Sequence, residues 1–169
     1  MSYLPCELHC HTIHSDGDFT VSELQKAAVD DHLAIIALTD HNTFSGWDEL
    51  DDNIIPAIRG IEWTTYFGHM LVLGANDFVD WRDAQPDNID EKIKQVKAVG
   101  GIVGIAHPYQ LGSPLCTGGR WEFNVRDWRN VDYIEVWHQN LYSAKRENER
   151  ALELWTSLLD KGYKIAATY

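Results

Sequence analysis

The chain has 169 residues, of which 44% are hydrophobic, and its formal net charge is −12 at pH 7. This length and apolar content are typical of one globular domain with a sizeable core, and they exclude a disordered chain. The acidic charge argues against partners that need a basic surface, namely nucleic acid and an anionic membrane. It is compatible with an anionic substrate, because bound divalent cations would reverse the local field.

The cysteines and the N-terminal residues indicate in which cellular compartment the protein is expected. The three cysteines are Cys6, Cys10 and Cys116. Their spacing gives no disulfide framework. Residues 1–5 do not begin a signal peptide, and the longest apolar run, residues 33–38, is too short to span a bilayer. We therefore expect one cytoplasmic domain over residues 1–169, and the oligomeric state stays open.

Short apolar strands alternate with amphipathic helices from the start of the chain. The first predicted strand covers residues 6–10. A helix is predicted from Ser22, because Ser22 and Gln25 have capping-box spacing. Its predicted buried face consists of Leu24, Ala27 and Ala28. The continuous apolar run 33–38 then predicts a buried strand that ends in Thr39-Asp40-His41.

The same alternation continues to the end of the chain. Strands are predicted over residues 57–62, 70–73, 102–106, 133–137 and 164–168. A helix is predicted over 88–98, where Ile89, Ile93 and Val96 are buried and Gly100-Gly101 ends it. The last helix is predicted over 143–159, with a buried face of Ala151, Leu152, Trp155, Leu158 and Leu159.

Seven strands, most of them separated by helices, predict an α/β protein with a largely parallel sheet. An open doubly wound sheet and a closed barrel both fit this alternation. In a doubly wound sheet, functional groups gather at one switch point, whereas in a barrel they follow the C-terminal ends of many strands. The second arrangement matches this sequence, so a barrel is favoured.

Residues of the types that bind metal ions, His, Asp and Glu, recur at the predicted strand ends. His9 and His11 are two residues apart on one strand and point to the same face, as two ligands of one ion would. The other candidates are Asp16 in a loop, His41, Glu62, His69 and His107 at strand ends, and His138 after the sixth strand. Because strand ends of a barrel converge on one mouth, these residues predict a multinuclear metal site.

Three nearby residues are not expected to be metal ligands. His32 follows the first helix, where a cation suits the helix dipole, so we expect a structural role. His14 lies beside the Asp16 loop and is expected to lie behind the ligands or to be exposed. Cys10 lies between His9 and His11 and therefore faces the opposite side of the strand.

The order of these motifs resembles the polymerase and histidinol phosphatase (PHP) family of metal-dependent hydrolases. The matching motifs are Glu7-Leu8-His9-Cys10-His11-Thr12, Ser15-Asp16-Gly17, Thr39-Asp40-His41-Asn42, Gly60-Ile61-Glu62, Gly68-His69 and Ala106-His107-Pro108. They extend over nearly the whole chain. Residues 62–69 and Val79-Asp80-Trp81-Arg82 also look like the carbaryl-hydrolase-like branch of this family.

The resemblance implies a distorted seven-stranded (β/α)7 barrel that holds up to three divalent ions, Mn, Fe or Zn, at the C-terminal mouth of the strands. His9, His11 and Glu62 would hold one ion, Glu62 with His69 and His107 a second, and Asp16 with His41 a third. Glu7 and Asp40 are implied as carboxylates behind these ligands. A closing Asp-x-His motif is expected after Ala166-Ala167-Thr168-Tyr169, so we expect either a truncated chain or an incomplete site.

The expected reaction is hydrolysis by a metal-bound hydroxide held by the Glu62 bridge, because clustered divalent ions bring the pKa of bound water near 7. The expected substrate is a small anionic phosphorylated molecule. Its candidate contacts are Arg120 in the loop 112–122, which can clamp an anion bidentately, and also His138 and Tyr109. The sequence has no Gly-x-Ser-x-Gly elbow that would indicate a serine nucleophile.

Three alternatives stay open. Carbamate or carboxylic ester hydrolysis is favoured by the branch motifs, and a metal-binding but inactive domain by the missing closing motif. A nuclease is disfavoured by the net charge of −12. Metal identity is also open, because His and carboxylate ligands suit Mn, Fe and Zn alike.

Overall fold

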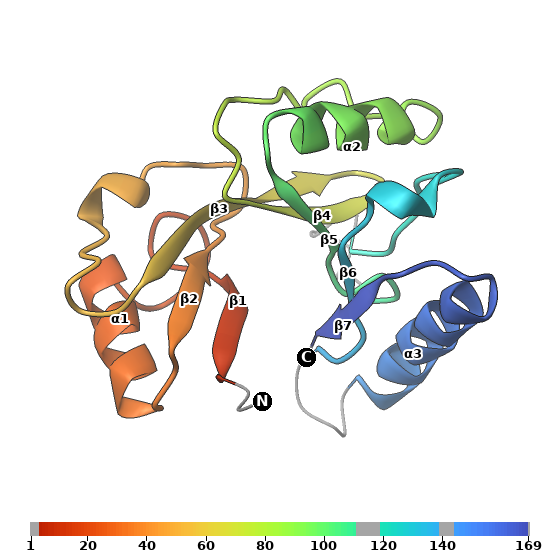
Figure 1. The fold of residues 1–169 in the computed structure, drawn as a ribbon. Helices are drawn as coiled ribbons and strands as arrows, with labels where there is room; N and C mark the ends of the chain where they lie inside the picture. Colours follow the sequence, from red (N-terminus) through yellow and green to blue (C-terminus); the bar gives the residue numbers. More distant parts are fainter. Residues whose placement is uncertain (1–3, 111–118, 139–143, 169) are drawn as a thin grey trace.

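Seven strands form one curled sheet in the computed structural model, which describes residues 4–110, 119–138 and 144–168. The strands are β1 (Cys6–Cys10), β2 (Ile35–Leu38), β3 (Ala57–Thr65), β4 (Gly68–Leu73), β5 (Ile102–Ile105), β6 (Tyr133–Glu135) and β7 (Ala166–Thr168). They lie in the sheet in chain order. Figure 1 shows the sheet bent into a half-barrel with β1 and β7 at its two edges. The α/β class and the seven strands are thus confirmed, whereas no pairing between described residues closes the barrel from β7 to β1.

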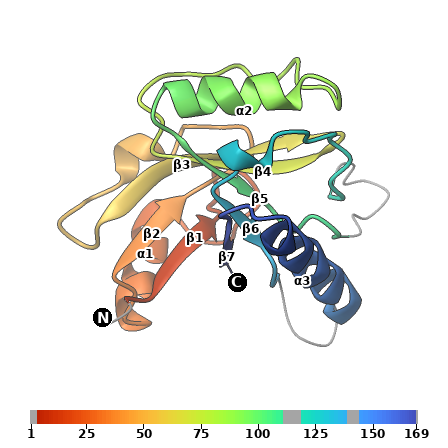
Figure 2. The same ribbon diagram turned by 45° about the vertical axis from the view of Figure 1, so that its right-hand side comes forward.

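Helices cover the outside of this half-barrel in the described part of the chain. They are α1 (Val21–Asp30), α2 (Ile89–Ala98) and α3 (Lys145–Asp160), with short 3-10 turns η1 (Trp47–Glu49) and η2 (Trp128–Asn130). Figures 1 and 2 show α1 beside β1 and β2, α2 over the middle of the sheet and α3 beside β6 and β7. None of the described helices combines the length and apolar character needed to cross a membrane.

The middle of the sheet is antiparallel, an exception within the largely parallel sheet that the sequence predicts. β4 runs antiparallel to both β3 and β5, and the other four strand pairs are parallel. Only residues 66 and 67 separate β3 from β4, and a parallel connection needs a dozen residues or more. The hairpin pairs His69 with Thr64, so the start of β4 lies at the same edge as the end of β3.

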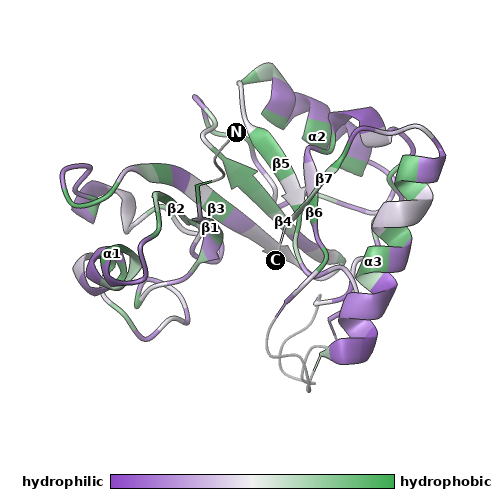
Figure 3. Cartoon of the chain, turned by 60° about the horizontal axis from the view of Figure 1, so that its bottom comes forward, coloured by the Kyte–Doolittle hydropathy of each residue, from purple (hydrophilic) through white to green (hydrophobic). Residues whose placement is uncertain are grey.

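Strand alternation in this hairpin separates the core from the concave face. Ile61, Trp63, Met70 and Val72 pack in the main core with Ile89 and Ile93 of α2. Successive side chains of a strand point to opposite faces. Glu62, between Ile61 and Trp63, and His69, next to Met70, therefore lie on the concave side. Figure 3 shows hydrophobic central strands and hydrophilic stretches along the helices.

The predicted strand ends need small corrections. β3 continues three residues beyond Glu62 to Thr65, because Trp63 is buried in the core and Thr64 and Thr65 pair with β4. β2 begins at Ile35 rather than at residue 33, and β7 begins at Ala166 rather than at residue 164. Glu62 therefore projects from within its strand instead of ending it.

The predicted cap of the first helix was wrong, and its predicted buried face was right only for Ala28, with Leu24 and Ala27 half-buried. Thr20 caps α1: its hydroxyl accepts from Glu23 N at 3.3 Å, and the Glu23 carboxylate accepts from Thr20 N at 2.9 Å. The Ser22 and Gln25 pair has the same spacing but lies inside the helix, and Gln25 bonds to the main chain of Asp51. The buried residues are Val21, Gln25 and Ala28.

The predicted face of the last helix was partly wrong as well. Ala151 and Leu158 are buried and Trp155 is half-buried, whereas Leu152 and Leu159 are 45% and 38% exposed. Only a narrow stripe of α3 contacts the sheet, so these two leucines lie at its margins. The predicted helix start at residue 143 falls outside the described residues.

A pair of substitutions tests the corrected cap. Thr20→Ala should lower the free energy of unfolding by about 1 kcal/mol, because it leaves an N-terminal amide of α1 without its acceptor. Ser22→Ala is the matched control and should have little effect, because Ser22 is an exposed residue inside the helix. Urea unfolding of both variants measures the difference, and a larger loss for Ser22→Ala would restore the predicted cap.

Candidate metal centre

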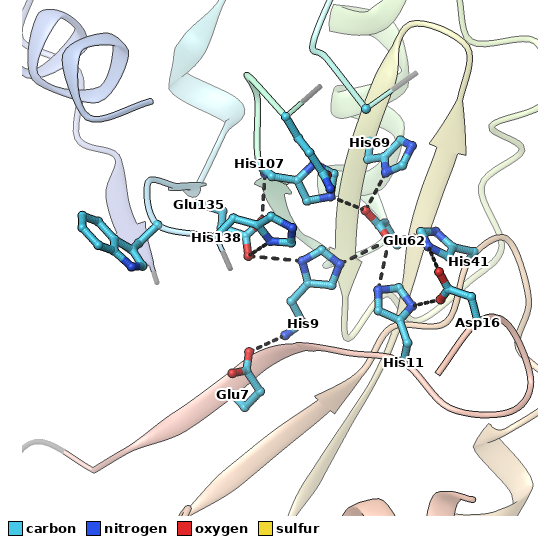
Figure 4. A pocket seen from close by; sticks show the side chains of 13 residues that line it. Glu7, His9, His11, Asp16, His41, Glu62, His69, His107, Glu135 and His138 are labelled. Atoms are coloured by element: carbon cyan, nitrogen blue, oxygen red, sulfur yellow. Dashed lines mark hydrogen bonds and ion pairs between the residues drawn. The ribbon is translucent and has the colours of Figure 1, made fainter. Parts of the chain in front are cut away.

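A cavity of about 390 Å³ opens on the concave side of the sheet. All seven predicted metal ligands line it: His9, His11, Asp16, His41, Glu62, His69 and His107. Figure 4 shows these side chains turned toward Glu62 from different strands and loops. The structure therefore brings together residues that are far apart in the sequence, as the strand-end pattern predicted.

Five imidazole rings surround the carboxylate of Glu62, which is fully buried. Its Oε1 lies 2.9 Å from His69 Nδ1 and 3.1 Å from His107 Nε2. Its Oε2 lies 3.2 Å from His9 Nε2, 3.2 Å from His11 Nε2 and 2.9 Å from His41 Nδ1. Burial alone would raise the pKa of Glu62, but the imidazoles, beginning with His107 and His11, hold this pKa far below its usual range. Glu62 is therefore a carboxylate and not a carboxylic acid.

His41 is fixed beside β3 by the residue that follows it. The side chain of Asn42 imitates a strand: its Oδ1 accepts from Thr64 N at 2.8 Å, and its Nδ2 donates to Thr64 O at 2.7 Å. Asn42 has φ 52°, a left-handed conformation that asparagine tolerates well. His41 Nδ1 also lies 2.5 Å from Thr64 Oγ1. The chain leaving β2 thus holds the imidazole of His41 against the end of β3.

Asp40 organises the loop that carries Asp16. Its Oδ1 accepts from Thr12 N at 2.7 Å and from Ser15 Oγ at 2.6 Å, and its Oδ2 accepts from Thr12 Oγ1 at 2.8 Å. The loop presents Asp16 Oδ1 3.6 Å from His11 Nδ1, and Asp16 Oδ2 3.4 Å from His41 Nε2. Asp40 thus stands behind the candidate ligands, as the family resemblance implied.

Glu7 lies next to the first candidate ligand on β1. Its Oε1 accepts from His9 N at 3.0 Å, and burial raises the pKa of its carboxyl group. The pKa of His9 itself would fall on burial alone, but contacts with Glu135 and Glu62 raise it to about 10. Without a bound cation, His9 is therefore an imidazolium at neutral pH.

Glu135 is a buried cavity residue that the sequence analysis missed. Its Oε1 lies 3.3 Å from His9 Nδ1, and its Oε2 accepts from His107 N at 2.8 Å. Burial raises its pKa, but contacts with His138 and His9 lower it more, and the net pKa lies well below the usual range. One signal was available in the sequence: Glu135 is a single acidic residue in the middle of the apolar segment 133–137.

Of the three predicted substrate contacts, only His138 lines the cavity. Its backbone is held by the buried Asn148 of α3, which accepts from His138 N at 3.0 Å and donates to His138 O at 3.2 Å. Arg120 is exposed, and the ring of Tyr109 lies under the guanidinium of Arg150, 4.3 Å from its centroid. Residues 112–118 of the predicted loop lie outside the described residues, so the roles of Arg120 and Tyr109 stay predictions.

The three residues not expected to be ligands lie apart from the cavity lining. His14 contacts Ser45 at 2.8 Å and Glu49 at 3.0 Å. His32 is exposed just beyond the end of α1. Cys10 is buried, and burial raises the pKa of its thiol, as expected for a packing residue.

The donor atoms suit divalent cations. Three groups of described residues offer donor atoms within 4.8 Å of one another: His9 with Glu62 and His107, His11 with Asp16 and His41, and His41 with Glu62 and His69. The family resemblance implied a different division, with His9 beside His11 and His69 beside His107. Glu62 Oε2, His69 Nε2 and His107 Nδ1 are buried without a well-aligned hydrogen bond. A cation would satisfy Glu62 Oε2, and imidazole with carboxylate is the ligand set of Zn, Mn and Fe sites.

Comparison with known proteins adds a family and a set of relatives. The PHP domain family matches residues 7–103. Two uncharacterized proteins of Methanocaldococcus jannaschii are similar in sequence. The first is 30% identical over 110 residues, which is 64% of this chain and 48% of that protein. The second is 29% identical over 153 residues, which is 81% of this chain and 85% of that protein.

Three solved structures share the fold. A two-domain protein of Bacteroides vulgatus, which contains a proposed PHP-like metal-dependent phosphoesterase, is 21% identical with a TM-score of 0.67 over 97% of this chain and 52% of that one. A proposed metal-dependent phosphoesterase of Bifidobacterium adolescentis is 19% identical, with a TM-score of 0.58 over 92% and 84%. An amidohydrolase of Chromobacterium violaceum, solved with sulfate and no metal, is 17% identical, with a TM-score of 0.59 over 96% and 84%.

This chain spans about half the length of the first sequence relative and of the first structural one. The identities of the three structures are low, so they establish the fold of this chain and not its activity.

The raised pKa of His9 predicts how the metal-free protein responds to pH. Its folded pKa of about 10 exceeds the ordinary value of 6.5, so its stabilisation is complete below pH 6.5 and is lost as the pH rises through 10. With a chelator present, the free energy of unfolding of the wild type should fall by on the order of a few kcal/mol over this window. Urea unfolding at a series of pH values measures it.

His9→Gln lacks the titrating group and should lose less stability over the same window. His32→Gln changes an exposed histidine outside the cavity and should follow the wild type. Parallel curves for the wild type and His9→Gln would contradict the link between His9 and the two carboxylates.

Proposed function

We propose, since this chain belongs to the PHP domain family, that it is a metal-dependent hydrolase acting on small phosphorylated molecules. One observation carries the proposal: five imidazole nitrogens lie 2.9 to 3.2 Å from a single buried carboxylate, that of Glu62. A carboxylate offers about four lone-pair sites, so five imidazoles are more than it can accept from, and this excess has no evident structural purpose. It does fit a cluster of cations that share Glu62.

His9 and His107 would hold one cation with Glu62, and His41 and His69 a second. His11 and Asp16, which are more exposed, would complete a third position together with His41. Bound there, divalent ions would acidify water to supply a nucleophile near neutral pH and would neutralise charge that develops on the substrate.

The residues of the chain supply binding and orientation. Glu62, fixed by β3 and buried beneath the cavity, would keep two cation positions close together. His138 is partly exposed at the cavity and is held by Asn148, so it is placed to contact a substrate or a leaving group. Its imidazole could donate a proton there, which is the usual role of a histidine beside a scissile bond.

The relatives favour phosphoesters. Two of the structures that share the fold are proposed metal-dependent phosphoesterases, and the third holds sulfate, which has the tetrahedral shape of phosphate. Because these likenesses lie at the level of the fold, they support the phosphoester as substrate only by analogy.

A second candidate substrate class is the aryl carbamate or carboxylic ester. It is favoured by the branch motifs, residues 62–69 and 79–82, which contribute most of the lining of one cavity of about 310 Å³. Tyr66, Phe67 and Trp81 give this cavity aromatic walls, and Thr64 connects it to His41 through the hydrogen bond described above. An aryl group would suit such walls.

A paired substrate assay separates these possibilities. After loading with Mn or Zn, the protein should release nitrophenol from p-nitrophenyl phosphate faster than from p-nitrophenyl acetate, and faster than naphthol from an aryl N-methylcarbamate. The opposite order would favour the second candidate, and cleavage of single-stranded DNA alone would point to a nuclease. Stable metal binding without turnover of any of these would instead indicate a metal-binding domain.

The role of Glu62 is tested by Glu62→Gln, which keeps the shape of the side chain and removes its charge. Metal content by mass spectrometry should drop, and turnover should fall by more than about 100-fold, the upper figure for a residue that only supports a ligand. Glu49→Gln is the matched control, because Glu49 also pairs with a histidine, His14, but lies outside the cavity. Equal metal content in wild type and Glu62→Gln would remove the basis of the proposal.

A further inference from the structure

We propose that Glu135 is the positioning residue of this centre, which orients the His9 ring and the main chain at His107 so that both imidazoles face Glu62. The inference deepens the proposed function and rests on it, because it concerns the same cavity. Glu135 is absent from the motifs that carry the family resemblance above.

Both oxygens of Glu135 are used, one by β1 and the other by the segment after β5. Oε1 lies 3.3 Å from His9 Nδ1 at the far edge of the sheet, and Oε2 accepts from His107 N at 2.8 Å. His9 and Glu135 are 126 residues apart in sequence. The carboxylate is buried, so water screens neither contact.

The first contact decides which nitrogen of His9 faces the centre. The ring bridges two carboxylates, with Nδ1 toward Glu135 and Nε2 3.2 Å from Glu62 Oε2. When Nδ1 donates its proton to Glu135, the lone pair of Nε2 is free for a cation. Carboxylates behind ligating histidines act in this way in metal sites, where they fix the tautomer and the ring orientation.

The second contact holds the turn that carries His107 into the cavity. His107 has φ 24°, in the left-handed region, and a residue other than glycine there costs about 1 to 3 kcal/mol unless its surroundings hold it. Its N–H donates to Glu135, while Ala106 N donates to His69 O at 3.2 Å. These bonds stabilise the bend that turns His107 Nε2 toward Glu62.

A carboxylate that only pairs strands would make similar main-chain contacts, and the partly exposed Asp132 provides that comparison. Asp132 lies directly before β6, and Glu135 is the last residue of β6. Asp132 Oδ2 accepts a hydrogen bond from Val103 N of β5 at 2.7 Å. Its other partner is Lys97, at 2.6 Å, and not a histidine of the cavity. Asp132 therefore resembles Glu135 in accepting from a main-chain N–H of β5 or of the segment after it, but has no link to the centre.

Glu135→Gln tests the inference with little change of shape. Glutamine offers one oxygen where two donors need acceptors, so either His9 Nδ1 or His107 N must face an NH2 group. We expect the affinity for Zn, measured by competition with a chromophoric chelator, to fall by about 10- to 100-fold. Asp132→Asn should leave this affinity unchanged. Circular dichroism and thermal unfolding of both variants establish that they are folded.

A second readout reports on His9 directly. In imidazole nitrogen–proton NMR spectra of the wild type, the proton on His9 Nδ1 should be protected from exchange and shifted downfield by Glu135. In Glu135→Gln this signal should move or disappear, and in Asp132→Asn it should stay. A purely structural role of Glu135 would change thermal stability and leave both the Zn affinity and this signal as in the wild type.

The outcomes distinguish this inference from the proposed function. If the wild type binds Zn and Glu135→Gln binds it equally with an unchanged His9 signal, the positioning role is overturned and the hydrolase proposal stands. If the wild type takes up no metal, the hydrolase proposal fails. The metal-free spectra then decide alone: a His9 signal that changes only in Glu135→Gln supports the positioning role, and an unchanged signal overturns it.

Discussion

The buried carboxylate of Glu62 is the constraint on which the rest of this structure depends. Burying a charged group away from water costs free energy, so the group stays charged only when hydrogen-bond or ion-pair partners surround it. Here the partners come from β1, from the segment after β2, from β4 and from the segment after β5, so one side chain ties together most of the half-barrel. The curvature of the sheet is what allows strands so far apart in the sheet order to reach the same carboxylate.

The antiparallel hairpin in the middle of the sheet makes this arrangement possible. In a strictly parallel barrel, ligands come only from strand C-termini, but β4 contributes His69 from its start because it runs the opposite way. Alternation along β3 and β4 then places Glu62 and His69 on the concave face and gives Trp63 and Met70 to the core under α2. The hairpin of β3 and β4 thus contributes both to the main core and to the middle of the site.

The sequence predicted which residues would meet in one cavity better than it predicted the bounds and direction of the elements around that cavity. The site was predicted from local patterns: the pair His9 and His11, two residues apart on one strand, and single His, Asp or Glu residues that follow apolar runs. All of the ligands predicted in this way line the cavity. The hairpin at residues 66 and 67 was missed because a short apolar run has no direction of its own. Thr20 was missed because two residue pairs share capping-box spacing, and only tertiary contacts decide between them. Glu135 was missed because its role depends on contacts 126 residues away in sequence.

Charge balance connects the site to the chemistry proposed for it. Four carboxylates line the cavity, those of Glu7, Asp16, Glu62 and Glu135, in a protein whose net charge is −12. Even with His9 as an imidazolium, four carboxylates leave this lining net negative, so the metal-free cavity repels an anion. On the proposed function, two divalent cations would cancel the four negative charges, and a third would leave a local excess of two positive charges, which matches a phosphate dianion. The acidic lining that excludes an anionic substrate from the metal-free protein is therefore what would make the loaded cavity selective for one.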